Sequence, residues 1–389
     1  MYTINTAQRR ARLGQRHFLA AGAKSAINVA EALLGLHSSD PATPYLSCQA
    51  RVDGFDALDL EQALYEDRTL LRMLGMRRTM FVVPPQLGEV IDAACAQRLV
   101  GGERQRLVGY IEAQGITTAG DAWLEDVESR TMEALADLGE ATARDLTARV
   151  PELAVKLSFG HGKKWASQVG LSTRVLFLLA TSNRIIRARP RGGWTSTQYR
   201  WARTDQWLDT PFDALDRPDA QTQLVAKWLT SYGPGTLTDI KWWTGWGVGL
   251  TRAALAGCGA VEVDLGGEVG YVLPGDLETP EETEPWAALL PSLDLTVMGW
   301  KDRDWYLGEH QDQLYDRNGN AGPTIWSDGR IVGGWAQHPD GEIRLEYLEP
   351  LSNAAIANIE LQAEALQLWL GERRHIPRFR TPVERRLND

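Results

Sequence analysis

The sequence predicts an α+β protein made of three successive helix–turn–helix units, each followed by a β-rich piece, and a β-strand domain at the C-terminal end. Three observations support this prediction. Apolar residues at helical spacing give way to short β-like runs three times before residue 286. Glycine-containing turns join several of these runs, which is typical of hairpins. Residues 286–389 instead alternate short apolar strands with turns.

The first unit covers residues 1–116. Apolar side chains recur at helical spacing over 26–36 and are followed by the polar turn His37-Ser38-Ser39-Asp40. This pattern predicts a helix that ends in a polar turn. The same unit has further predicted elements, which are helices over 41–51 and 57–64 and a strand over 77–83 that is stopped by Pro84 and Pro85.

The second unit covers residues 117–205. Thr142 has the position and side chain of a helix N-cap. Arg191-Gly192-Gly193 separates two strand-like runs, so we expect a β-hairpin there. The helices expected in this unit lie over 120–138, 142–149 and 164–181.

The third unit covers residues 206–285. Its pattern predicts two strands joined by Gly266-Gly267, placed after a pair of helices. A helix–turn–helix followed by such a hairpin is a winged helix, in which a helix enters a DNA groove and the hairpin lies on the backbone. We therefore predict three tandem winged-helix domains. The helices expected here cover 217–231, a segment opened by Thr236–Asp239, and 250–256.

Residues 286–389 predict a small antiparallel β-domain closed by a helix. Ser327-Asp328-Gly329 and Pro339-Asp340-Gly341 have the composition of hairpin turns between short strands. A helix is expected over 353–371, followed by a tail rich in arginine.

The composition narrows the class of protein. No apolar run approaches the roughly 18 residues of a membrane span, and the first residues lack an apolar leader. Cys48, Cys95 and Cys258 are widely spaced and fit reduced thiols. We expect a cytoplasmic protein with no membrane partner, no cofactor and no metal site.

The charge is unevenly distributed along the chain. The net charge is −10, yet ten Lys and Arg and no Asp or Glu lie between Lys156 and Arg203. Such a block indicates a phosphate-binding face, although clustered solvated arginines are the alternative. Duplex DNA is the expected partner, and Trp194 could stack on a base or pack on its own sheet. The candidate DNA contacts are Arg77, Arg78, Lys163, Lys164, Arg174, Arg187, Arg189, Arg191 and Trp194.

Several sequence blocks resemble a known family. The blocks "LLGLH", "DPA", "LLPSLDLTVMGWKDR" and "SDGRIVGGW", with three winged helices and a C-terminal β-domain, resemble the winged-helix DNA glycosylases that unhook bulky and crosslinking alkylated guanines (AlkZ/YcaQ-like). The resemblance implies a catalytic Gln-apolar-Gln or Gln-apolar-Asp motif in the turn after the first amphipathic helix. Here His37-Ser38-Ser39 stands in its place, so both polar positions depart from the pattern.

The turn leaves more than one role open for each residue. The catalytic candidates are His37, Ser39 and Asp40. His37 could accept a hydrogen bond from a water molecule, Ser39 offers a hydroxyl, and Asp40 could supply a carboxylate. Equally, Asp40 before Pro41 fits an N-cap, His37 fits a helix end, and Ser39 fits a turn hydroxyl bonded to local backbone.

Two functional hypotheses remain open from the sequence, with a protein-interaction module as a third. The first is a monofunctional, metal-free glycosylase that releases bulky alkylated purines with water, in DNA repair or resistance to a genotoxic natural product. The second is a non-catalytic winged-helix DNA-binding protein that regulates transcription or shields DNA or a drug. In both cases we expect a monomer associated with the bacterial nucleoid.

Overall fold

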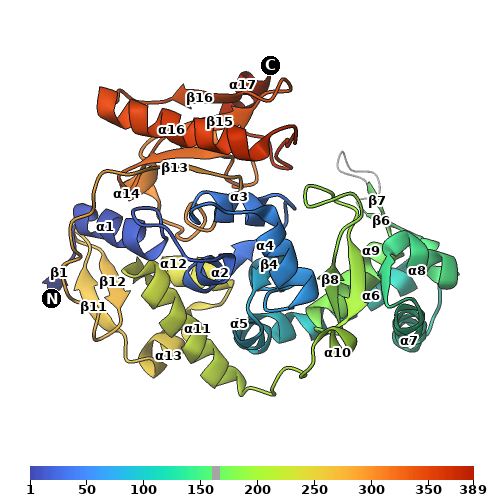
Figure 1. Ribbon diagram of the computed structural model, residues 1–389. Helices are drawn as coiled ribbons and strands as arrows, with labels where there is room; N and C mark the ends of the chain where they lie inside the picture. The colour runs from blue at the N-terminus through green and yellow to red at the C-terminus, as the bar shows by residue number, and fades with distance from the viewer. Residues whose placement is uncertain (160–166) are drawn as a thin grey trace.

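The computed structural model describes residues 1–159 and 167–389 and confirms the mixed α+β class. The C-terminal sheet and its helix lie at the top in Figure 1, the N-terminal segment lies beneath them, and residues 97–203 form a lobe at the right. The described strands form several small sheets that are antiparallel except where β1 pairs with β11. The separate small sheets explain why the strand signals are short and scattered along the sequence.

The N-terminal segment places the turn at residues 37–40 next to a three-stranded sheet. The sheet has the order β2-β4-β3, and His37 lies opposite Phe81. Gly35 precedes β2 with a φ of +107°, and a Cβ there would lie 2.9 Å from the Val83 side chain. Only glycine fits this close approach. The elements are β1 (Tyr2–Thr3), α1 (Thr6–Arg16), α2 (Ala26–Ala32), β2 (Leu36–His37), α3 (Thr43–Gln49), α4 (Ala57–Glu61), β3 (Leu71–Leu74) and β4 (Met80–Val83).

Two sequence predictions in this segment are wrong in detail. The strand predicted over 77–83 begins only at Met80, because Arg77 and Arg78 form the turn between β3 and β4 with left-handed φ values of 50° and 65°. The helix predicted from residue 41 begins at Thr43. In both places the element begins two or three residues later than the pattern predicts. The pattern therefore did not show where the side chains before the element point.

The second lobe combines helices with two small sheets. Thr142 caps α8 as predicted, since its hydroxyl accepts from the Asp145 N–H and Asp145 reciprocates. The helix predicted over 164–181 begins only at Leu171, because Ser167–Gly170 pairs with β6. The elements of the lobe are α6 (Gln97–Ala113), α7 (Gly120–Leu138), β5 (Glu140–Thr142), α8 (Ala143–Arg149), β6 (Lys156–Phe159), β7 (Ser167–Gly170), α9 (Leu171–Thr181), β8 (Ile185–Ala188) and β9 (Arg200–Arg203). Before it comes α5 (Pro85–Ile91) and after it α10 (Thr204–Trp207), and both pack into the core of the body.

The third segment follows its sequence signals closely. Thr236 and Asp239 form a capping box that opens α12, and the strands around Gly266-Gly267 pair antiparallel as predicted. Trp243 is buried in the core, as its helical spacing indicated. The elements are α11 (Arg217–Tyr232), β10 (Gly235–Thr236), α12 (Leu237–Thr244), α13 (Val248–Gly257), β11 (Val261–Asp264) and β12 (Val269–Val272).

The C-terminal segment is an antiparallel sheet of order β13-β14-β15-β16 that packs against α16. Both predicted hairpin turns are confirmed, at 327–329 and 339–341. The tail after α16 runs back over the molecule and ends in a helix that the sequence did not predict. The elements are β13 (Ala287–Leu290), α14 (Asp304–Leu307), α15 (Gln311–Leu314), β14 (Thr324–Ser327), β15 (Arg330–Gln337), β16 (Ile343–Tyr347), α16 (Asn353–Leu370) and α17 (Pro382–Asn388).

Two large hydrophobic cores distinguish a body from a lobe, and a third, small one consists of Ile4, Val263 and Val272. The first core joins the first, third and C-terminal segments and reaches β8 and β9, whereas the second fills the lobe and takes in Leu74 and Met80 from the ends of β3 and β4. The junction between the cores therefore lies beside the β3–β4 hairpin and the turn at 37–40. Within the described residues, no helix has both the length and the apolar character to cross a membrane.

Candidate active site and nucleic-acid interface

His37 is buried and packed in the core. The residue is 4% exposed, and its ring meets the Phe81 ring edge-on at 5.4 Å. Nδ1 accepts a long hydrogen bond of 3.5 Å from the Ser39 backbone N–H. Burial lowers the His37 pKa to about 3, and the nearby charge of Arg77 adds to the effect. The His37 ring is therefore uncharged at neutral pH, and it supports the turn through its packing on Phe81 and its contact with the Ser39 N–H.

Asp40 fastens the C-terminal tail to the turn. It is 1% exposed, its Oδ1 accepts from the Ala42 N–H at 3.0 Å, and its Oδ2 accepts from the Arg378 N–H at 2.8 Å. The predicted N-cap role of Asp40 is wrong, because Ala42 is the residue that precedes α3 and no side chain caps that helix. Both carboxylate oxygens accept hydrogen bonds, so the group is oriented by one backbone amide two residues away and one from the distant C-terminal tail.

Ser39 is half-buried at the wall of a cavity of about 420 Å³. The Ser39 carbonyl accepts a hydrogen bond of 3.2 Å from the Arg378 guanidinium, which also borders the cavity. The remaining walls come from the β3–β4 hairpin, the start of α8, α9, β8, and the strand region before and within β9. This cavity is large enough for a nucleotide-sized group.

Four arginines line this cavity, and none of its described lining residues is Asp or Glu. Three larger hollows, of about 510, 740 and 810 Å³, all have Asp or Glu side chains in their walls. Among these four, the cavity at Ser39 is thus the one with arginine and no carboxylate in its described walls. The arginines are Arg78, Arg174, Arg187 and Arg378.

The structure brings three of the predicted DNA contacts together in this cavity. Arg187 lies 3.9 Å from the centre of the Tyr199 ring. Arg174 lies over Phe159 at 4.9 Å. Arg78 also pairs with Glu103 at 3.1 Å, so part of its charge is already compensated. These contacts hold the guanidinium groups at the surface of the cavity.

Two other predicted contacts pack elsewhere. The Arg77 guanidinium lies 4.0 Å from the Trp242 ring, and burial lowers its pKa to about 10. Trp194 is buried, stacks on Tyr45 at 4.9 Å and packs on Trp369 at 5.6 Å. Trp194 is therefore held in the body of the protein. Lys163 and Lys164 lie outside the described residues.

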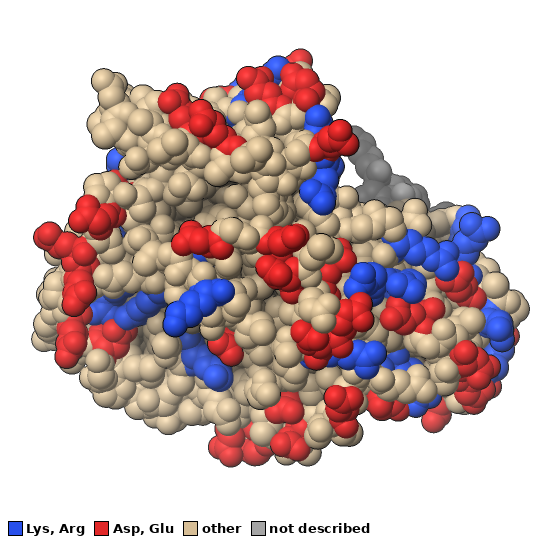
Figure 2. Space-filling view, viewed as in Figure 1, with Lys and Arg blue, Asp and Glu red and all other residues tan. Residues whose placement is uncertain are grey.

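The basic block of the sequence is partly neutralised by the fold. Arg189 pairs with Glu61 and Glu66, and Arg191 pairs with Asp145. Figure 2 shows acidic and basic side chains interspersed on the viewed face. A charge block in the sequence is therefore broken up in space, because carboxylates from other segments reach it. The block's other ion-paired arginines are Arg184, Arg200 and Arg203.

Arg378 and Arg72 were missed by sequence reasoning. The basic tail around Arg378 was visible in the sequence, yet nothing there showed that it returns to the turn at 37–40. Arg72 lies in a strand-like run and gave no signal of its own. Its position beside the cavity depends on packing between the body and the lobe.

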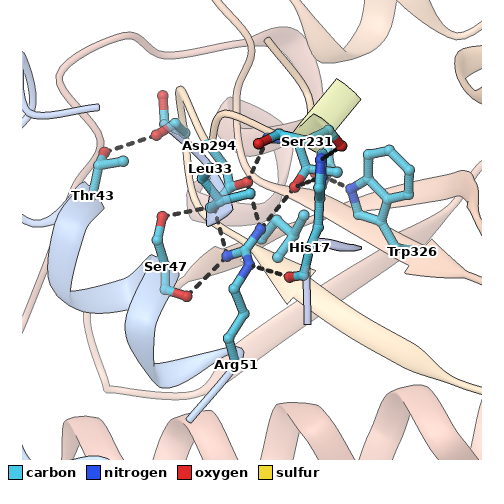
Figure 3. A network of polar contacts seen from close by, with 12 residues as sticks. His17, Leu33, Thr43, Ser47, Arg51, Ser231, Asp294 and Trp326 are labelled. Carbon is cyan, nitrogen blue, oxygen red and sulfur yellow. Dashed lines mark hydrogen bonds and ion pairs between the residues drawn. The ribbon is translucent and has the colours of Figure 1, made fainter. Parts of the chain in front are cut away.

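A buried polar network holds α3 behind the turn, as Figure 3 shows. The Arg51 guanidinium forms an ion pair of 2.8 Å with Asp294, and the Ser47 hydroxyl donates to the same carboxylate at 2.6 Å. The Thr43 hydroxyl donates to the Ser292 carbonyl at 2.8 Å. These contacts tie α3 to the "LLPSLDLTVMGW" block and so fix the turn that precedes the helix.

The described residues contain no group of three or more His, Cys, Asp or Glu arranged to hold a metal ion. Of the cysteines, Cys48 and Cys95 are buried and Cys258 is half-buried, and none forms a disulfide.

The fold is that of a DNA glycosylase. The chain is similar to the Streptomyces sahachiroi DNA glycosylase AlkZ, with a TM-score of 0.73 and 21% identity over 96% of this chain and 98% of that chain. A model of the family "DNA glycosylase AlkZ-like" matches residues 30–369. The chain therefore belongs to the AlkZ-like DNA glycosylase family. No curated protein shows significant sequence similarity to it.

Proposed function

We propose that the protein binds duplex DNA, with the strand passing the cavity at Ser39. The arginine-lined cavity is the observation that carries this proposal. Cationic side chains near a DNA strand displace its condensed counterions, which favours association. The family, whose fold matches a known DNA glycosylase, supports the same partner.

The domain arrangement belongs to this proposal. Residues 1–116, 117–205 and 206–285 are three winged-helix domains, and 286–389 is the C-terminal β-domain. The hairpins β8–β9 and β11–β12 follow helices in the order that a winged helix requires. An asymmetric array of this kind can hold DNA as a monomer associated with the nucleoid.

Excision of an alkylated purine is the second candidate function, and the placement of Ser39 at the cavity wall favours it. In this reaction a water oxygen bonds to the anomeric carbon while the glycosidic bond breaks. The bond electrons neutralise the cationic base, and the water proton leaves to solvent. The Ser39 hydroxyl orients the water, whereas His37 and Asp40 act through the shape of the turn.

The DNA-binding proposal is tested by fluorescence anisotropy on a labelled duplex over a range of salt concentrations. We expect the logarithm of the binding constant to fall linearly with the logarithm of the salt concentration. Thermal unfolding of each preparation checks that the protein is folded. Folded protein that shows no duplex binding at low salt overturns the proposal.

Excision is tested by single-turnover release of modified guanine from alkylated duplexes, bulky adducts included. We expect Ser39→Ala to slow release by at least about a hundredfold, the lower end of the range for losing one positioned group. Ser129→Ala is the matched control, because Ser129 is exposed on α7. Equal release by Ser39→Ala and the wild type removes Ser39 from the reaction, and no release by the wild type leaves DNA binding alone.

A further inference from the structure

Arg72 is a buried cation without a charged partner in the described part of the chain. It lies on β3 and is 1% exposed. None of its three guanidinium nitrogens reaches an acceptor at regular hydrogen-bond geometry. Arginine stays protonated in proteins, and a buried charge of this kind is costly unless something compensates for it. The polar groups around it are the hydroxyls of Tyr45, Tyr65 and Tyr199, which outweigh its burial and raise the pKa of Arg72 but are themselves neutral at neutral pH.

Tyr199 connects this buried cation to the cavity. Its ring centre lies 5.5 Å from the Arg72 guanidinium and 3.9 Å from that of Arg187. The Tyr199 hydroxyl is buried and reaches no partner at regular hydrogen-bond geometry among the described residues, although the Arg187 guanidinium lies close enough to interact with it. Burial raises the pKa of Tyr199, so the hydroxyl keeps its proton at neutral pH and can donate it in a hydrogen bond.

Arg187 is the second positive charge beside the Tyr199 ring, and it borders the cavity. It lies over both Tyr199 and Trp201, and its Nε is buried without a hydrogen-bond partner among the described residues. Burial lowers the pKa of Arg187 to about 10, and the charges of Arg72 and Arg378 contribute. The group remains protonated at neutral pH, so the Tyr199 ring lies between two positive charges, those of Arg72 and Arg187.

Arg378 closes the arrangement from the C-terminal tail. Its backbone is fixed by Asp40 and its guanidinium by the Ser39 carbonyl, so the tail brings a cation to the turn that follows β2. Arg378, Arg187 and Tyr199 all border the cavity of about 420 Å³. The described walls therefore offer several donors and no carboxylate.

We propose that Arg187, Tyr199 and Arg378 form a subsite for a phosphodiester of the DNA strand, with Arg72 reinforcing its positive potential from behind. This inference rests on the proposed DNA binding. A guanine alkylated at N7 is itself a cation, so arginine walls disfavour it and favour the anionic backbone. Planar guanidinium groups also match the geometry of phosphate oxygens. The subsite thus anchors the backbone beside Ser39 and leaves the base to another surface.

The experiment measures duplex affinity and its salt dependence for Arg187→Gln, Arg378→Gln and Tyr199→Phe in the full chain. For each arginine variant we expect about tenfold weaker binding and a salt slope smaller by about 0.9. Tyr199→Phe, which loses only the hydroxyl, should weaken binding a few-fold. Arg378 is exposed on the tail, so its variant tests the subsite even where Arg187→Gln reduces folding.

Arg386→Gln is the matched control, because Arg386 pairs with Glu346 at the surface and does not border the cavity. Its affinity and salt slope should equal those of the wild type. If the wild type binds and both arginine variants, Arg187→Gln and Arg378→Gln, keep its affinity and salt slope, the subsite is overturned while DNA binding stands. Absence of wild-type binding overturns both.

Competition at constant ionic strength separates the sources of phosphate. We expect millimolar inorganic phosphate and a deoxynucleoside monophosphate to displace little duplex, because a strand phosphodiester is positioned by the neighbouring nucleotides. Efficient displacement by inorganic phosphate that is lost in Arg187→Gln identifies a free-anion site and overturns the assignment to the strand.

Discussion

Arg51 and Arg72 are both buried arginines of the N-terminal segment, yet their surroundings differ completely. Arg51 is 2% exposed, and each of its nitrogens donates a hydrogen bond, including two to the Asp294 carboxylate. Arg72 is 1% exposed and meets aromatic rings and hydroxyls without a carboxylate. One guanidinium is fully satisfied inside the protein, and the other is not.

This difference distinguishes an arginine that stabilises the fold, Arg51, from one whose charge remains available to a ligand, Arg72. The Arg51 network joins the first segment to the C-terminal β-domain through the ion pair with Asp294. The two charges compensate each other, so the Arg51 guanidinium has no free donor for a ligand. Arg72 lies at the junction of body and lobe, behind a cavity whose described walls are cationic. An uncompensated charge costs stability, and such costs are tolerated where a ligand can supply the missing charge.

The largest expected effect is on the satisfied arginine. Asp294→Asn leaves Arg51 as an unpaired buried charge and should lower the free energy of unfolding by about 3–5 kcal/mol. Although burial raises the pKa of Asp294, the ion pair with Arg51 outweighs it and lowers the pKa. The stabilisation is therefore present above the unfolded pKa of about 3.9 and is lost at lower pH. Denaturant unfolding measures the change.

Asp205→Asn is the control for this prediction, because Asp205 forms an exposed pair with Arg203. Its loss should cost less than about 1 kcal/mol. Equal effects of the two substitutions would contradict a special role for the buried network.

The next effect concerns two buried histidines. His17 lies beside Arg51, and His37 lies at the end of β2. Burial lowers the pKa of His17 and of His37 to about 3, whereas the unfolded value is about 6.5. Both rings stay neutral in the folded protein, so the stability is complete above pH 6.5 and falls with acidification toward pH 3. Each ring contributes about 1.4 kcal/mol per pH unit within that window.

His37→Phe should remove one of these contributions. Denaturant unfolding between pH 7 and pH 4.5 should then show a slope smaller by about one proton than in the wild type. An unchanged slope would show that His37 is accessible to protons in the folded protein. A substrate-facing role for its ring would then regain support.

A smaller effect of opposite sign is expected for the unsatisfied arginine. Arg72→Met replaces an unpaired buried charge by an apolar side chain and should raise the free energy of unfolding by about 1 kcal/mol. Duplex affinity should fall in the same variant, because the positive potential behind Tyr199 is lost. A less stable variant would indicate that the tyrosines already compensate the charge.

The smallest effect is expected for an arginine whose charge is paired at the surface. Arg203→Gln should change stability by no more than about 0.5 kcal/mol and leave duplex affinity within about twofold. Loss of affinity comparable to that of Arg187→Gln would show that the whole basic block, rather than the cavity, faces DNA.

Local features were predictable from the sequence because their interactions are local. The Thr142 and Thr236 caps involve partners three residues away, and the Gly266-Gly267 hairpin joins adjacent strands. The start of α9 was not predictable, because Ser167–Gly170 forms the strand β7 by pairing with β6. The β6 strand lies outside the segment whose apolar spacing predicted the helix. The turn geometry at Arg77 and Arg78 was missed for a similar reason.

The candidate site was predictable only in outline. The sequence identified the turn at 37–40, the basic block and the resemblance to the glycosylase family. It could not show that His37 is buried against Phe81 or that Asp40 binds the tail. It also could not separate Arg187, which borders the cavity, from Arg191, which pairs with Asp145.

The sequence by itself therefore determined the α+β class, the order of the helices and hairpins, and the family to which the chain belongs. Only the tertiary structure decided which charges are satisfied and which remain available. The physical reason is that a charge is compensated by whatever lies next to it in space. Arg51 meets a carboxylate 243 positions away and Asp40 meets an amide 338 positions away, whereas Arg72 meets no carboxylate within the described residues.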